Sequence, residues 1–193
     1  MSLAKRLAKT KAKGVNTFIG NESKFLSEDA KLLTTALPIY NVANSGKING
    51  GMTPGVTILA GASGTGKTLL SWVGAKAFQN KYPDGVVLFY DSEYGTTNSY
   101  LDGLGIDTSR VLHVPVNNLE EMRFDIMAKL EELSEEDDVY IIMDSLGNIA
   151  SKKEVDDALK ENTAADMSRA KTMKGIFRQI TPILTSKGIY FCG

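Results

Sequence analysis

The sequence predicts an α/β protein in which a mostly parallel sheet carries helices on both of its faces. Short apolar runs bounded by turn residues alternate with longer segments whose apolar residues recur at helical spacing. The short runs are apolar at consecutive positions, as expected of strands that are buried on both faces. With 193 residues, of which 42% are hydrophobic, the chain is long enough for one such domain and too short for two.

The expected elements alternate along the chain. Strands are expected over residues 56–60, 86–90, 111–114 and 139–143, and a last strand begins at 189. Helices are expected over 69–81, 98–104, 119–133 and 173–184, where apolar residues share one helical face. In a parallel sheet the ligand-binding loops lie beyond the carboxyl ends of the strands, so we expect the functional residues there.

Composition excludes several classes of protein. The formal net charge of −1 provides no global positive field, so any binding to DNA has to come from local patches. Cys192 is the only cysteine, which excludes an intrachain disulfide and fits a reducing, cytoplasmic location. No apolar run approaches the ~20 residues of a membrane span, and the basic N-terminus is no signal peptide. We therefore expect a soluble protein with no membrane partner.

The first residues differ in character from the rest of the chain. Residues 1–40 are expected to form an arm, and residues 41–193 the core domain. The arm is polar, with basic residues crowded near its start. Two interpretations stay open: the arm is a disordered tail, or it docks on a neighbouring subunit through Phe18 or Phe25, because a single aromatic anchor is a common interface hot spot.

A phosphate-binding motif lies between the first expected strand and the first expected helix. It matches G-x-x-x-x-G-K-[ST] and consists of Gly61, Ala62, Ser63, Gly64, Thr65, Gly66, Lys67 and Thr68. Glycines let consecutive backbone N–H groups point at phosphate oxygens, and the positive end of the helix dipole adds to the attraction. Lys67 is expected to reach the β- and γ-phosphates of ATP, and the Thr68 hydroxyl to ligate Mg²⁺.

Two carboxylates follow later strands. Asp144 ends the apolar run 139–143, where it is expected to hold Mg²⁺ opposite Thr68. Glu93 follows the strand 86–90, and a carboxylate there suits the deprotonation of the water that attacks the γ-phosphate. On residue type alone, the Asp-Ser-Glu segment at 91–93 fits a cap of the next helix equally well.

Several longer stretches resemble the RecA family of recombinases, and in particular its phage branch. These stretches are Gly50-Gly51-Met52, Leu88 to Glu93, Asp144 to Glu154, Ser168 to Lys174 and Thr181-Pro182. The resemblance covers most of residues 23–192. The stretch after Asp144 is far more specific than a bare phosphate-binding motif.

The resemblance implies roles for further residues. Glu93 is expected to be the catalytic carboxylate, Tyr100 to stack on adenine or else pack in the core, and Thr97 to lie near the base. Residues 148–163 fall where the family carries its first DNA-contacting loop, although their charges are mixed and a solvated loop stays possible. The candidate DNA contacts are Lys152, Lys153, Arg169 and Lys171. The arm corresponds to the segment through which family members join subunits.

We therefore expect the ATP-binding core of a DNA-dependent ATPase that forms filaments on single-stranded DNA and promotes strand exchange in recombination and repair. Gly193 stands just inside the last strand, so the sheet is expected to be incomplete there. For this chain, ATP·Mg²⁺ binding is expected to survive, DNA-stimulated hydrolysis to be weak and strand exchange to be absent. A non-catalytic adaptor of a recombination filament is one alternative. A small-molecule kinase, which usually carries an arginine-rich lid, and a hexameric helicase core fit the sequence less well.

Overall fold

The computed structural model describes residues 2–10, 13, 17–23, 31–159 and 168–193. The chain forms two compact units, Met1–Lys31 and Leu32–Gly193. The second unit begins before the boundary expected at residue 41, because Leu33 exchanges two backbone hydrogen bonds with Met52 at 2.8 and 3.1 Å. Residues 32–40 thus belong to the core.

The described residues of the N-terminal unit include two short helical segments. Helix α1 (Leu3–Ala8) begins where the Ser2 side chain accepts a hydrogen bond from the backbone N–H of Lys5, and the 3-10 helix η1 (Gly20–Glu22) follows. The side chains of Leu3, Leu7 and Phe18 are all exposed. Phe25, the second expected anchor, lies outside the described residues.

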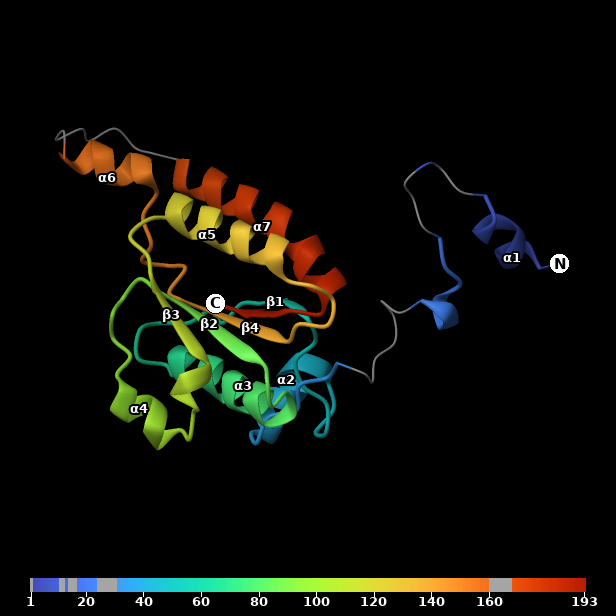
Figure 1. Ribbon diagram of the computed structural model, residues 1–193, viewed down its shortest axis with the longest axis horizontal. Helices are drawn as coiled ribbons and strands as arrows, with labels where there is room; N and C mark the ends of the chain where they lie inside the picture. Colours follow the sequence, from blue (N-terminus) through green and yellow to red (C-terminus); the bar gives the residue numbers. More distant parts are fainter. Residues whose placement is uncertain (1, 11–12, 14–16, 24–30, 160–167) are drawn as a thin grey trace. The chain divides into compact units, whose positions relative to one another are not determined.

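The core unit is built on five parallel strands in the order β1-β5-β4-β2-β3 (Figure 1). Their bounds are Gly55–Thr57 (β1), Val86–Asp91 (β2), Val111–Pro115 (β3), Val139–Asp144 (β4) and Tyr190–Cys192 (β5). In the register, Asp91 pairs with Asp144 and also with Pro115. The carboxyl ends of β2 and β4 therefore lie side by side.

Helices cover both faces of the sheet, as the sequence predicts (Figure 1). Along β4, Ile141 and Met143 join the cluster under α5 (Leu119–Glu132) and α7 (Ser168–Lys187), whereas Tyr140 and Ile142 join the cluster under α3 (Lys67–Lys81). Helices α2 (Pro38–Ser45) and α4 (Asn98–Gly103) contribute Tyr40 and Leu101 to that second cluster. This alternation explains why β4 is apolar at consecutive positions from Val139 to Met143.

The remaining elements are η2 (Thr108–Arg110) and α6 (Lys152–Leu159). Neither α2 nor α6 is among the helices expected from apolar periodicity. Strand β1 ends at Thr57, before the end of the expected run 56–60, and the chain then continues into the loop before α3. Within the described ranges, no helix is long and apolar enough to cross a membrane.

Candidate active site

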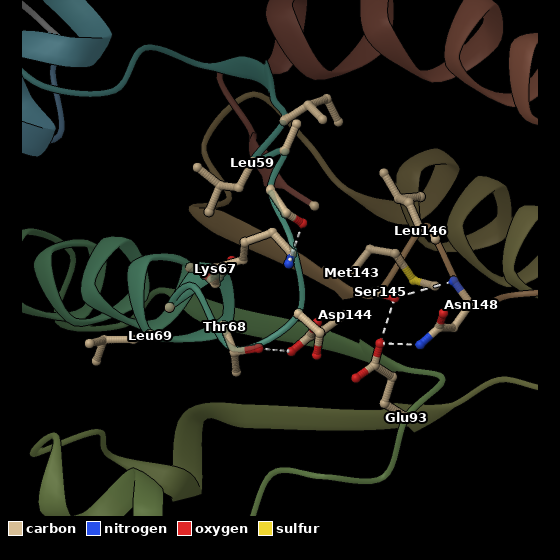
Figure 2. Close-up of a pocket in the computed structure, with 18 of the residues that line it drawn as sticks. Leu59, Lys67, Thr68, Leu69, Glu93, Met143, Asp144, Ser145, Leu146 and Asn148 are labelled. Carbon is tan, nitrogen blue, oxygen red and sulfur yellow. Dashed lines mark hydrogen bonds between the residues drawn. The ribbon is translucent and has the colours of Figure 1, made fainter.

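A cavity of about 650 Å³ opens beyond the carboxyl ends of β1, β4 and β5. The loop between β1 and α3 forms one wall, and the loop after β4 forms another (Figure 2). The side chains of Lys67, Thr68, Glu93, Tyr100 and Asp144 all line this cavity. The fold therefore brings together residues from four separate segments of the chain.

Backbone geometry explains the glycines of the loop between β1 and α3. Gly64 and Gly66 have φ values of 75° and 87°, in the left-handed region that a side chain disfavours. A Cβ on Gly61 would lie 2.9 Å from the Thr65 hydroxyl. The Lys67 ammonium donates to the carbonyl oxygens of Gly61 and Ala62, each at 2.8 Å. The loop thus curls around the Lys67 ammonium at the wall of the cavity.

Thr68 and Asp144 meet across the cavity floor. The Thr68 hydroxyl donates to Asp144 Oδ2 at 2.6 Å (Figure 2). Desolvation raises the pKa of Asp144, and the charges of Glu93 and Asp91 raise it further against the opposing Thr68 hydrogen bond. A hydroxyl beside a carboxylate in a negative surrounding is a donor set that suits Mg²⁺, which takes oxygen ligands and keeps several waters.

The turn after β2 is fixed by Asp91 and Ser92. The buried Asp91 carboxylate accepts from the backbone N–H of Glu93 at 3.0 Å and of Tyr94 at 2.7 Å. The Ser92 hydroxyl contacts the Asp144 and Ser145 carbonyl oxygens at 3.3 and 3.1 Å. These contacts tie the ends of β2 and β4 together, so Glu93 is presented from a rigid turn.

Glu93 points toward the loop after β4. Its Oε1 atom accepts from the Ser145 hydroxyl at 2.7 Å and from Asn148 Nδ2 at 2.5 Å (Figure 2). The cap of the next helix, α4, is the Thr97 hydroxyl, which accepts from the backbone N–H of Tyr100. Glu93 is therefore not a helix cap, and its carboxylate lines the cavity.

Of the two residues expected near the adenine, Tyr100 lines the cavity and Thr97 does not. Tyr100 lines the cavity, its side chain is 38% exposed, and it belongs to neither hydrophobic cluster. Desolvation and the nearby Asp144 raise the pKa of Tyr100. Thr97 is not among the lining residues. Its described role is to cap the helix that carries Tyr100.

The candidate DNA-contacting residues differ in their surroundings. Lys152 and Lys153 are exposed on α6, where Lys153 pairs with Asp157, and Lys171 is exposed on α7. The Arg169 guanidinium instead donates to backbone carbonyl oxygens of the loop after β4. Residues 160–163 of the expected DNA loop lie outside the described residues.

Three residues of the site were not assigned roles from sequence. Asp91 holds the turn, and Ser145 and Asn148 hold Glu93. Asp91 stands at a strand end, a signal that marks it as a candidate. No periodicity or spacing singles out Asn148, because its contact with Glu93 joins residues far apart in the chain.

Comparison with known proteins gives two matches. Residues 6–191 match the family model described as the RecA N-terminal domain. The chain is also 46% identical over 167 residues to a "Recombination and repair protein" of Enterobacteria phage T4. That alignment covers 86% of this chain and 42% of the relative. The chain thus spans about two fifths of the length of this relative.

Proposed function

The chain belongs to the RecA family, and from that premise we propose that it binds and hydrolyses ATP as the core of a DNA-dependent ATPase. The larger activity is filament formation on single-stranded DNA, with homologous pairing and strand exchange. The observation that carries the proposal is the cavity that brings the Gly61–Thr68 loop, Asp144 and Glu93 together. Each of these has a distinct task in phosphoryl transfer.

The residues around the cavity divide the work of hydrolysis. The loop N–H groups and Lys67 bind the phosphates once the ammonium exchanges the carbonyl oxygens of Gly61 and Ala62 for phosphate oxygens. Thr68 and Asp144 would hold Mg²⁺, which when bound neutralises charge on the phosphates. Glu93 orients the attacking water and takes its proton. Tyr100 offers a ring face for the adenine.

DNA and neighbouring subunits are proposed partners at other surfaces. The exposed cations Lys152, Lys153 and Lys171 supply charge for the phosphates of single-stranded DNA. Such contacts read the backbone, so little sequence preference is expected. Self-association is proposed to run through the N-terminal unit, whose exposed Leu3, Leu7 and Phe18 offer apolar anchors.

The test compares the wild type with Lys67→Ala and Glu93→Ala in ATP binding and in ATP hydrolysis, with and without single-stranded DNA. Lys67→Ala is expected to abolish ATP binding. Glu93→Ala is expected to keep binding and to lower the hydrolysis rate by about 10²–10⁴-fold, the usual contribution of a general base. Hydrolysis that Glu93→Ala leaves unchanged would contradict the proposed catalysis. Nucleotide binding with no hydrolysis in the wild type would instead favour the non-catalytic adaptor.

A further inference from the structure

The carboxylate of Glu93 is anchored through one of its two oxygens. Oε1 accepts from the Ser145 hydroxyl at 2.7 Å and from Asn148 Nδ2 at 2.5 Å. In the described part of the chain, no hydrogen bond is recorded to Oε2. Two bonds to a single oxygen restrict how the carboxylate turns, and they leave the second oxygen available for a water molecule.

Both donors stand on the loop after β4, and Arg169 holds that loop from its other side. Arg169 Nε donates to the carbonyl oxygen of Ile149 at 2.9 Å, and Nη2 donates to those of Leu146 and Gly147 at 2.6 and 2.8 Å. These three carbonyls bracket Asn148 in the chain. The guanidinium therefore fixes the backbone that carries the Asn148 amide.

The position of Arg169 is itself fixed by the core. It lies in the first turn of α7, a helix whose Ile176 and Ile180 side chains are fully buried in the cluster shared with α5. The far end of the clamped loop is also anchored, since Ile149 is buried and the carbonyl oxygen of Ala150 accepts from Leu119 at 2.9 Å. Arg169 on α7 thus binds the loop backbone on both sides of Asn148, and Asn148 in turn binds Glu93.

We propose that Arg169 is a positioning residue for ATP hydrolysis, which acts by holding the loop after β4 so that Asn148 and Ser145 orient Glu93. The inference rests on the proposed function of Glu93. Arginine suits this task because its rigid, forked donors reach several carbonyls at once, whereas a lysine ammonium is a point charge on a flexible stem. The guanidinium already donates to backbone carbonyl oxygens of the protein, so we assign it a structural role in the site and not a contact with DNA.

This role predicts a different outcome from a direct DNA contact. As a DNA contact, Arg169 would affect hydrolysis only when DNA is present, and Arg169→Lys would keep the charge that binds a phosphate. As a positioning residue, it affects hydrolysis without DNA, and Arg169→Lys does not rescue it because the fork is lost. The decisive measurement is therefore DNA-free turnover.

The experiment measures kcat and KM for ATP hydrolysis without DNA, and the Kd for ATP, in the wild type, Arg169→Lys and Asn148→Ala. Arg123→Lys is the matched control, since Arg123 bridges α5 and α7 through a single exposed contact to Gln179 at 3.1 Å. We expect kcat to fall by about 10–100-fold in Arg169→Lys and Asn148→Ala, as for residues that orient a functional group. KM, Kd and the Arg123→Lys rates are expected to stay within about twofold of the wild type.

Each other outcome overturns the inference. A normal kcat in Arg169→Lys or in Asn148→Ala would mean that the contacts of Arg169 and Asn148 do not orient Glu93. A loss of ATP affinity as large as the loss of kcat would mean that the loop after β4 binds nucleotide instead. If Arg169→Lys fails to fold, Asn148→Ala decides, because Asn148 is exposed. A wild type that hydrolyses no ATP either with or without single-stranded DNA would remove the proposed catalytic function and this inference together. Turnover that depends on Glu93 but not on Arg169 or Asn148 would remove this inference alone.

Discussion

Asp144 and Glu93 stand at the ends of two adjacent strands, yet their surroundings differ. Asp144 is half-buried, with one hydrogen bond from Thr68 and two carboxylates nearby. Glu93 is exposed and accepts two hydrogen bonds at one oxygen. The first environment penalises negative charge in the ligand-free protein and so favours a bound cation. The second orients a carboxylate that stays accessible to water.

The raised pKa of Asp144 predicts that this residue destabilises the ligand-free fold at neutral pH. The folded chain retains the Asp144 proton above the ordinary value of 3.8, so its stability falls as the pH rises through the window above that value. Without nucleotide and Mg²⁺, Asp144→Asn is therefore expected to raise the Tm at pH 7 by about 1–3 °C. The gain should disappear near pH 4.

Thermal unfolding at both pH values measures this, with Asp102→Asn on the exposed face of α4 as the control for loss of a charge. A lower Tm for Asp144→Asn at pH 7 would contradict the prediction that the charged Asp144 destabilises the fold. Asp144→Asn should also remove most of the Mg²⁺-dependent gain in ATP affinity, because a carboxylate ligand is lost.

Helix α6 shows how a local signal can outweigh a poor apolar pattern. Its sequence, KKEVDDAL, has one strongly apolar position in its first turns and mixed charges, so its periodicity favours a solvated loop. Ser151 and Glu154 form a capping box, in which the Glu154 backbone N–H donates to the Ser151 hydroxyl at 3.2 Å and the Ser151 N–H donates to the Glu154 carboxylate at 2.6 Å. The S-x-x-E spacing was readable in the sequence.

Loss of that cap should destabilise the fold measurably. Ser151→Ala is expected to lower the free energy of unfolding by about 1 kcal/mol, because a buried capping hydroxyl is removed from the first helical N–H groups. Glu154→Gln, which keeps an oxygen acceptor, is the matched control and should cost less than about 0.5 kcal/mol. Urea unfolding followed by circular dichroism measures both, and equal effects of the two variants would argue against the capping box.

Helix α2 was missed for a different reason. Pro38 at its start and Gly46 in the left-handed conformation at its end are ordinary boundary residues. The helix itself, however, depends on Asn41, whose buried amide binds the backbone of Thr35 and Ile48. A buried polar residue breaks the apolar stripe, so periodicity alone does not predict such a helix.

At the scale of the whole molecule, the core unit consists of the parallel sheet and the helices that cover its two faces. Each strand pairs in parallel with its neighbours in the sheet. Successive side chains of β4 pack alternately into the hydrophobic clusters on the two faces. The N-terminal unit exposes Leu7 and Phe18, at 57% and 49% of their surface. An exposed apolar arm of this kind supports the proposed role in self-association.

A double variant tests that role. Leu7→Ser combined with Phe18→Ser is expected to weaken self-association by at least about tenfold, as for loss of interface anchors, without changing the Tm of the core. Sedimentation velocity with ATP, Mg²⁺ and single-stranded DNA measures the association. Phe124→Ser is the control, since this side chain is 72% exposed on α5. Association that is lost in the control and kept in the double variant would assign the interface to the core unit.

The sequence by itself determined the fold class, the alternation of strands and helices, the glycine-rich loop at Gly61–Thr68 and the positions of Asp144 and Glu93 at or just after strand ends. These follow from local rules, because glycine spacing, apolar runs and strand ends are properties of neighbouring residues. Only the tertiary structure decided that Asn148 and Ser145 hold Glu93, that Arg169 binds the loop carrying them, and that Thr97 caps α4 without lining the cavity. Those contacts depend on side-chain direction and on the packing of α7 against the sheet, which no local pattern specifies.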